Sequence, residues 1–212
     1  MKTKKFTTSQ LTILGLMAGI LFLMAYTPLG YLNIGPLAVT FNVIPVAVCA
    51  IVLGPTGGAI AGAVFGLTSF MQAIGIGGVS ALGSALFQIN PFMTAVQCFG
   101  PRILDGICIG FIYRAVHKKA NTYVSCAVTG FFSAFLNTLF FMTALIVMFG
   151  NTELIRNLMG GHNIIVGCCL MVGVNAISEM VSSTIITAAV GTALSKAHLI
   201  PAVQIVKTDT AV

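Results

Sequence analysis

Six long apolar runs, separated by short stretches rich in glycine, proline and charged residues, account for most of the chain. A helix that crosses the hydrocarbon of a membrane needs about 20 mainly apolar residues. Each run reaches or approaches that length once a few flanking residues are added. The runs are roughly Leu11–Ala25, Val39–Leu53, Gly57–Ile74, Ile103–Val116, Tyr123–Phe149 and Ile164–Leu194. We therefore predict an all-α, polytopic membrane protein with six transmembrane helices in a compact bundle.

The composition indicates the same class. Of the 212 residues, 58% are hydrophobic and 7% are charged, whereas soluble domains are about 45–50% apolar and about 25% charged. So few charges cannot cover the surface of a soluble globule of this size. Intrinsic disorder is excluded as well, because it requires low hydrophobicity.

The basic residues predict the orientation. Six spans place both termini on one side of the membrane, and that side is predicted to be the cytoplasm. The cytoplasmic segments are then 1–10, 54–56, 114–122 and 195–212. They hold eight of the ten Lys and Arg residues, and only Arg102 and Arg156 lie elsewhere. Since Lys and Arg are enriched in cytoplasmic segments, we predict cytoplasmic tails at 1–10 and 196–212 around a bundle formed by residues 11–195.

Three connections are expected on the external side, at Thr27–Ala38, Gly75–Pro101 and Gly150–Asn163. The middle one is long and is interrupted by glycines and by Asn90-Pro91. Long segments without regular structure are often functional. Irregular backbone at membrane depth is tolerated only against protein or a water-filled cavity. We expect the external loops to fold over a cavity that opens outward.

Small residues recur every fourth position in two of the runs. The first run carries Gly15 and Gly19 with Ala18 beside them, and the third carries Gly58, Gly62 and Gly66. Such residues share one helix face and let another backbone come close. The partner is either a helix of this chain or a separate protein. We favour packing within the chain for the third run and an external partner for the first.

Polar side chains deep in apolar runs are the first candidates for a binding site, because intramembrane polar groups are rare and costly. Glu179 and Asn175 lie in the sixth run and Asn137 in the fifth. Both asparagines lie about 18 Å from the external ends of their helices at 1.5 Å per residue, so they are expected to face one cavity. Hydrogen bonding between helices is the alternative. Asn90 and Gln97, from the external connection, complete the candidate set.

Arg102 follows Pro101 at the predicted start of the fourth run. Proline is favoured in the first turn of a helix, and the free amides there attract anions. Arg102 is therefore a candidate for binding a carboxylate in a bidentate manner, with help from the helix dipole. The competing partner is Asp105, three residues on, which would form an ordinary ion pair within the helix.

No catalytic or metal-binding pattern is found. The sequence lacks a phosphate-binding Gly-x-x-x-x-Gly-Lys-Ser/Thr loop, a His-Glu-x-x-His motif and a Gly-x-Ser-x-Gly motif. Its six cysteines include no Cys-x-x-Cys, and its three histidines lie at or beyond the ends of the runs. We predict that the chain is not an enzyme, holds no metal and has no cofactor of its own.

Several short motifs resemble the substrate-binding (S) component of energy-coupling factor (ECF) vitamin transporters. In the first half they are Thr27-Pro28-Leu29-Gly30, Ile34-Gly35-Pro36, Val39-Thr40-Phe41, Ile44-Pro45-Val46, Leu53-Gly54-Pro55 and Phe65-Gly66-Leu67-Thr68-Ser69. Gly100-Pro101-Arg102, followed by Gly106 and Gly110, is similar to the fourth span of that family. The resemblance covers nearly the whole chain, and the pattern is most similar to the pantothenate-specific members.

The resemblance implies a multi-pass protein of the bacterial cell membrane, with a vitamin site closed by its first and third external loops. It implies a transmembrane coupling (T) subunit and two ABC-type ATPase subunits, which use ATP, as partners. In that family the first span docks on the T subunit through a seam of small residues, here Gly15, Ala18 and Gly19. The family is thought to topple in the membrane, a motion that few charges around the bundle would ease.

Pantothenate has one carboxylate, one amide and two hydroxyls, which suit Arg102, Asn137 and Asn175. Folate or another carboxylated vitamin would also suit an arginine. Two other classes stay open from the sequence. A solitary secondary transporter usually contains an internal repeat, and none is convincing here. An intramembrane enzyme would need a second ionisable group at the depth of Glu179.

Overall fold

Helices make up nearly all of the regular structure of the protein. The computed structural model describes residues 7–27, 30–33, 38–77, 80–158 and 164–200. Its helices are α1 (Thr8–Tyr26), α2 (Val43–Ala73), α3 (Ala81–Ile89), α4 (Pro91–His117), α5 (Thr122–Phe149), α6 (Glu153–Leu158) and α7 (Ile164–Lys196), and its strands are β1 (Tyr31–Asn33) and β2 (Ala38–Thr40). Five of these helices, α1, α2, α4, α5 and α7, are long and apolar enough to cross a membrane. The prediction of a helical, multi-pass membrane protein is confirmed.

The predicted second and third runs join in α2, which turns back on itself at Gly54. This glycine has φ 73° and ψ −163°, outside the helical region. A methyl group at Gly58 would lie 3.0 Å from Cβ of Ala50, and one at Gly57 would lie 3.0 Å from the carbonyl oxygen of Cys49. Eight residues of a straight helix span about 12 Å, so these contacts show that the two halves of α2 run side by side in opposite directions.

Glycines let the second half of α2 pack closely against α4. A side chain at Gly58 would collide with the carbonyl of Gly106, and one at Gly62 would collide with the carbonyl of Arg102. Four residues on, a methyl group at Gly66 would lie 2.9 Å from the carbonyl oxygen of Cys98. The two helices are therefore antiparallel in a fixed register. Packing within the chain, which we favoured for this run, is confirmed.

The fourth helix begins much earlier than the predicted run. The side chain of Asn90 accepts a hydrogen bond from the amide of Met93 and caps the helix, and Pro91 occupies its first turn. Asparagine at the cap and proline just after it are strong start signals. The connection 75–101 is accordingly helical over α3 and the first turns of α4. The prediction of a largely irregular loop there was wrong.

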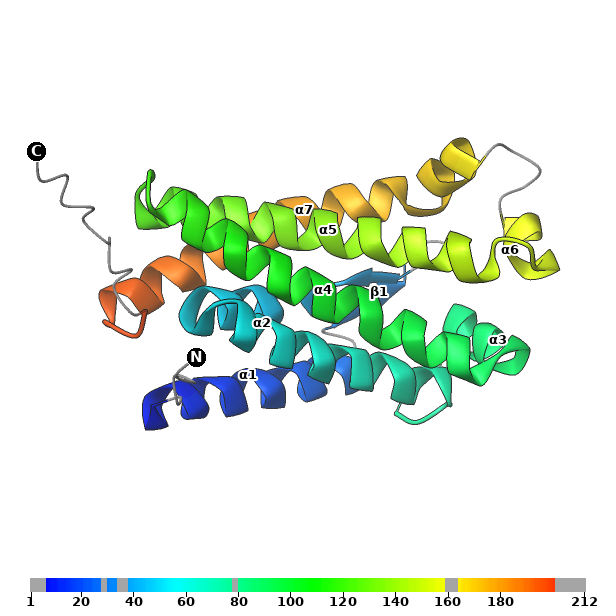
Figure 1. The fold of residues 1–212 in the computed structure, drawn as a ribbon, viewed down its shortest axis with the longest axis horizontal. Helices are drawn as coiled ribbons and strands as arrows, with labels where there is room; N and C mark the ends of the chain where they lie inside the picture. Colours follow the sequence, from blue (N-terminus) through cyan, green and yellow to red (C-terminus); the bar gives the residue numbers. More distant parts are fainter. Residues whose placement is uncertain (1–6, 28–29, 34–37, 78–79, 159–163, 201–212) are drawn as a thin grey trace, which may run out of the picture.

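Two short strands, which were not predicted, accompany the helices. β1 and β2 pair in antiparallel fashion, with Tyr31 opposite Thr40. The predicted second run began at Val39, but helix α2 begins only at Val43. Figure 1 shows the hairpin inside the bundle, midway along it and flanked by the long helices.

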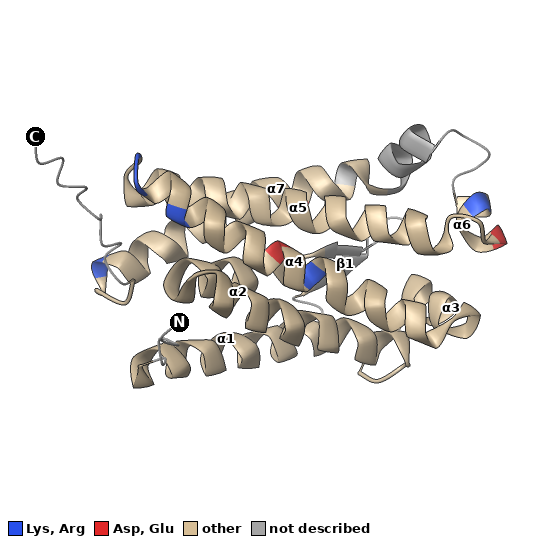
Figure 2. Cartoon of the chain, viewed as in Figure 1, with Lys and Arg blue, Asp and Glu red and all other residues tan. Residues whose placement is uncertain are grey.

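The charged ends of the helices gather at one end of the bundle. The start of α1, the turn between α4 and α5 and the end of α7 lie together there, whereas α3 and α6 lie at the opposite end (Figure 1). The last turn of α4 carries Arg114, and that of α7 carries Lys196. Figure 2 shows basic positions at this end and very few charges along the middle of the helices.

Candidate functional site

Buried polar residues follow one face of three long helices at intervals of about one turn, which places them on the same side of each helix. On α4 they are Thr94, Gln97, Arg102 and Asp105, on α5 they are Ser125, Thr129, Ser133 and Asn137, and on α7 they are Asn175, Glu179, Ser183 and Thr187. Polar side chains in a membrane bundle face its interior and mark functional sites. Five of the six predicted site residues, all except Asn90, lie on these faces.

The guanidinium of Arg102 is held between two aromatic rings. Its Cζ atom lies 5.2 Å from the ring centroid of Phe65 and 4.9 Å from that of Phe141. Nη1 donates a 2.8 Å hydrogen bond to the carbonyl of Gln97. Nε is buried and has no hydrogen-bond partner. Two ring faces therefore stabilise the cation, and at least one of its donors is available to an acceptor.

Two sequence-based ideas about Arg102 need correction. Because α4 begins at Pro91, Arg102 lies eleven residues inside the helix and not at its N-terminus. Free terminal amides and the helix dipole therefore do not assist it, since that effect fades within the first turn. The alternative of a simple pair with Asp105 is not seen either. The guanidinium bonds to Gln97, and Oδ1 of Asp105 is buried without a partner.

Amide groups surround the guanidinium. Gln97 donates from Nε2 to the carbonyl of Phe141 over 2.9 Å, and its Oε1 is buried without a partner. Asn137 lies one turn before Phe141 on α5, is 6% exposed, and has an unpartnered Oδ1. Buried polar groups in native proteins almost always find a partner. Two acceptors and one donor near Phe141 are thus ready for a polar molecule.

Asn42, the residue before α2, was missed by the sequence analysis. It is completely buried, and neither its Oδ1 nor its Nδ2 has a hydrogen-bond partner. The next residue, Val43, accepts a 3.3 Å hydrogen bond at its carbonyl from Oγ of Ser133, which is one turn from Asn137. Asn42 therefore belongs to the same cluster. The only signal in the sequence was a lone amide next to an apolar run.

Glu179 and Asn175 complete the buried polar face of α7. Oε1 of Glu179 accepts a 2.6 Å hydrogen bond from the backbone amide of Thr40, at the end of β2. The carboxylate also lies within electrostatic range of Arg102. Asn175, one turn earlier, is 4% exposed. Both residues are buried as predicted, and the partner of Glu179 is the hairpin.

Asn90 lies apart from this cluster. Its Oδ1 accepts from the amide of Met93 over 3.1 Å, and twelve residues of α4 separate it from Arg102, which is about 18 Å along a helix. Its role in the structure is to cap α4.

The cluster has the chemistry of a site for a small polar anion. It combines one cation with amide donors and acceptors in a dry environment, where such groups bind strongly because leaving them unpaired is costly. Among the described residues, no group of three or more His, Cys, Asp or Glu side chains is placed to hold a metal ion.

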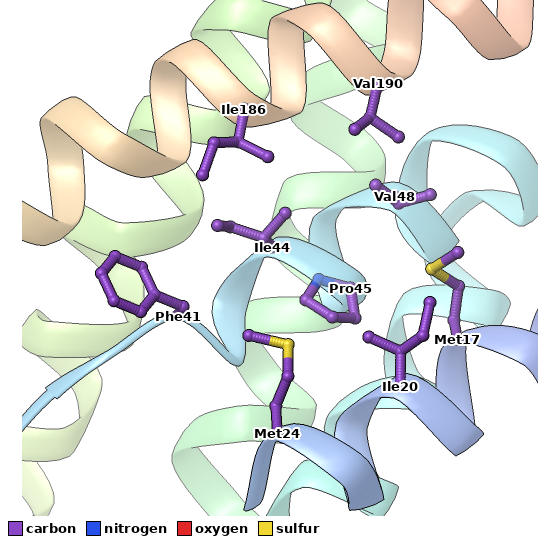
Figure 3. A pocket seen from close by; sticks show the side chains of 9 residues that line it. All are labelled: Met17, Ile20, Met24, Phe41, Ile44, Pro45, Val48, Ile186 and Val190. Carbon is purple, nitrogen blue, oxygen red and sulfur yellow. The ribbon is translucent and has the colours of Figure 1, made fainter. Parts of the chain in front are cut away.

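A separate pocket of about 420 Å³ lies between α1, the start of α2 and α7. Its lining is entirely apolar. The residues are Met17, Ile20, Met24, Phe41, Ile44, Pro45, Val48, Ile186 and Val190 (Figure 3). No hydroxyl or carboxylate could be satisfied there, so it is not a second candidate for a polar ligand.

The small residues of α1 lie on an open face. Nothing lies within 4 Å of a methyl group placed at Gly15 or Gly19, and both glycines are exposed while Ala18 is half-buried. The glycines of α2, by contrast, are packed against α4. At Gly15 and Gly19 this face of α1, which also carries Ala18, is therefore not covered by the described part of the chain.

Comparison with known proteins agrees with this geometry. The model of the family described as "ECF transporter, substrate-specific component" matches residues 9–191. A pantothenate transporter, PanT, from Leuconostoc mesenteroides is 33% identical over 178 residues, which cover 81% of each chain. A pantothenic acid transporter, PanT, from Lactococcus lactis subsp. cremoris is 28% identical over 208 residues, which cover 92% of this chain and 98% of the relative.

Proposed function

Since the chain belongs to the family of ECF transporter substrate-specific components, and is thus a transport subunit, we propose that it captures pantothenate outside the cell and delivers it to the cytoplasm. The observation that carries the proposal is the buried guanidinium of Arg102, whose Nε is unpartnered and lies among unsatisfied amide groups. The pantothenate transporters among its relatives support the choice of vitamin.

The groups of pantothenate match the unsatisfied atoms of the cluster. The carboxylate pairs with Arg102, because a guanidinium binds carboxylates through charge-assisted hydrogen bonds. The two hydroxyls donate to Oε1 of Gln97 and Oδ1 of Asn137. Asn42, whose Oδ1 and Nδ2 are both unpartnered, offers an amide donor and acceptor to the amide of the vitamin. A ligand that lacks these groups would leave the same atoms unpaired, which is the physical basis of selectivity.

A thermal-shift screen of water-soluble vitamins on the purified protein tests the ligand. A ligand at about 100 times its Kd stabilises the folded state by about 2.7 kcal/mol, so pantothenate should raise the unfolding temperature and the others should not. If folate or another carboxylated vitamin raised the unfolding temperature and pantothenate did not, that vitamin would be the ligand. No shift with any vitamin would contradict the proposal.

We further propose that transport requires a T subunit and two ATPase subunits. This chain carries no phosphate-binding loop of its own, and the open face of α1 is available for the T subunit. Vesicles that contain this chain alone should bind but not accumulate pantothenate, whereas vesicles with all subunits should accumulate it when ATP is present. Accumulation by the isolated chain without ATP would instead indicate a secondary transporter.

Six membrane crossings with both tails in the cytoplasm are the topology we propose, in the cell membrane of a bacterium. The reversal of α2 at Gly54 supports six crossings from five long helices. The tails are residues 1–10 and 196–212, and the bundle is formed by residues 11–195. The basic ends of α4 and α7 lie beside the start of α1, which supports a common cytoplasmic side.

A further inference from the structure

A hydrogen bond between residues far apart in the sequence joins the hairpin to α7. The backbone amide of Thr40 donates to Oε1 of Glu179 over 2.6 Å, across 139 positions of the chain. Glu179 is 5% exposed. Hydrogen bonds to ionised acceptors are short and about twice as strong as neutral ones. This contact is therefore a firm attachment between two elements.

The strand register explains why Thr40 needs this partner. The amide of Phe41 donates to the carbonyl of Gly30 over 3.1 Å, on the side that faces β1. In an antiparallel pair, successive residues point their amides to opposite edges. The amide of Thr40 therefore lies on the outer edge of β2, away from β1. Edge amides at membrane depth must find an acceptor, and Glu179 supplies it.

Thr40 also links the hairpin to the proposed site. Its Oγ1 accepts a 3.2 Å hydrogen bond from the amide of Asn42, and Asn42 carries two unsatisfied side-chain atoms in the buried cluster. The position of Asn42 thus depends on Thr40, and Thr40 depends on Glu179. A shift of the hairpin would move an amide that is proposed to contact the vitamin.

Glu179 is directed at the hairpin and not at the vitamin. Whenever Glu179 is ionised it repels a carboxylate on the ligand, since juxtaposed like charges in a buried site are costly. One oxygen of Glu179 is already occupied by Thr40. The geometry of Glu179 is that of a residue directed at the hairpin.

We infer that Glu179 is a positioning residue for vitamin retention: it holds the hairpin of β1 and β2 in place through the amide of Thr40, and it does not itself touch the vitamin. The inference rests on the proposed function for its ligand. The attachment of the hairpin to α7 can be tested without any ligand.

The first test is amide hydrogen exchange of the ligand-free protein, followed in a peptide that covers Thr40. Glu179→Ala should speed exchange at this amide by about tenfold or more, the scale of one charge-assisted hydrogen bond. Glu179→Gln, which keeps an acceptor but no charge, should give a smaller increase. Exchange in the middle of α5 should not change. Unchanged exchange at Thr40 would overturn the inference.

The second test measures the kinetics of labelled pantothenate on the same variants. Loss of the attachment should raise the dissociation rate by about tenfold and leave the fraction of binding-competent protein unaltered, whereas general destabilisation would lower that fraction. Faster dissociation without faster exchange at Thr40 would indicate direct contact and overturn the inference. If the wild-type protein binds no pantothenate, the proposed function fails, and the exchange experiment still decides the role of Glu179.

A backbone change provides an independent check. Thr40→Pro removes the donor, which an edge position tolerates because its amide does not pair with another strand. Thr40→Ala also removes the hydroxyl that accepts from Asn42 but keeps the donor, so it is the matched control. The increase in dissociation rate from Thr40→Ala to Thr40→Pro should equal that caused by Glu179→Ala, and adding Glu179→Ala to Thr40→Pro should raise the rate no further, because each of these steps deletes the same interaction. Additive effects would contradict the inference.

Discussion

Arg102 is the one cation buried midway along the described part of the bundle, and its surroundings are adapted to an anion that comes and goes. The rings of Phe65 and Phe141 stabilise the charge without using its hydrogen-bond donors. One donor is taken by the carbonyl of Gln97, and Nε is not used. A permanent ion pair would have occupied these donors. The arrangement therefore favours ligand binding over a purely structural role.

Replacement of Arg102 tests this at the level of one residue. Arg102→Ala should weaken pantothenate binding by at least about tenfold, which is about 1.4 kcal/mol. Arg102→Lys keeps the charge but loses the planar fork, so it should also bind more weakly. Calorimetry measures both affinities. Arg156→Ala, at an exposed position of α6, is the control and should bind normally. Affinity within twofold of wild type in both Arg102 variants would remove Arg102 from the site.

Gly54 is the residue at which the backbone requires glycine. Its φ of 73° and ψ of −163° lie in a region that only glycine enters readily. Gly54→Ala should lower stability by about 1–3 kcal/mol because of this strain. The buried thiols of Cys49, Cys98 and Cys126 allow unfolding to be followed with a thiol-reactive dye. An added Arg114→Ala should not restore stability, although that side chain lies against Gly54, since the strain is in the backbone.

At the scale of elements, the contact between α2 and α4 is the closest in the bundle. Glycine at three successive turns of α2 brings its backbone onto that of α4, and the register places Gly62 against Arg102. The same contact therefore sets the depth of the proposed ligand-binding cation. The hydrophobic effect does not drive helices together inside a membrane, so close packing of this kind is what stabilises their association.

The α2–α4 contact can be tested with a methyl group. Gly62→Ala should destabilise the protein by about 1–3 kcal/mol, as overpacking usually does. Gly19→Ala is the matched control, in the exposed helix α1, because nothing lies within 4 Å of the added methyl. It should be neutral or slightly stabilising, since alanine favours helix over glycine. Equal effects of the two changes in the thiol-dye assay would show that the contact is not tight.

At the scale of the whole molecule, the helix α1 presents its small residues outward. Gly15→Leu and Gly19→Leu should prevent assembly with the T subunit and the ATPases while pantothenate binding by the isolated chain stays intact. Co-purification with the coupling subunits measures assembly. Gly173→Leu adds the same bulk at another open glycine, on α7, and should leave assembly unchanged. Normal assembly of both α1 variants would place the docking face elsewhere.

The distribution of charge also acts on the whole molecule. Most of the basic residues in the described part of the chain lie at one end, and the middle of the bundle carries few charges on its helices (Figure 2). Exposed charge in hydrocarbon is costly. A bundle with an apolar belt can therefore change its tilt in the membrane at lower cost, as expected for a subunit that delivers its ligand by toppling.

Much of the helical architecture was predictable because hydropathy is a local property. Apolar runs identified all five long helices, and the polar residues Asn137 and Glu179 within those runs are buried in the bundle. The predicted start of α4 was too late in the sequence because the polar residues Gln97 and Arg102 lower the hydropathy of its first turns. Asn90-Pro91 was nevertheless a recognisable helix-start signal. The hairpin was missed because two strands of three residues have no periodicity to detect.

By itself, the sequence determined the membrane class, the apolar runs and the charge asymmetry, since each follows from composition along the chain and from transfer to lipid. Only the tertiary structure decided which groups meet: Glu179 with the amide of Thr40, Gly62 with the carbonyl of Arg102, and Ser133 with the carbonyl of Val43. These contacts join positions that are distant in the sequence. Many other residues of the chain have the same chemistry, and only the packing of the helices decides which pairs meet. The seven per cent of charged residues predicted a membrane protein, but the fold decided which of them lie in its interior.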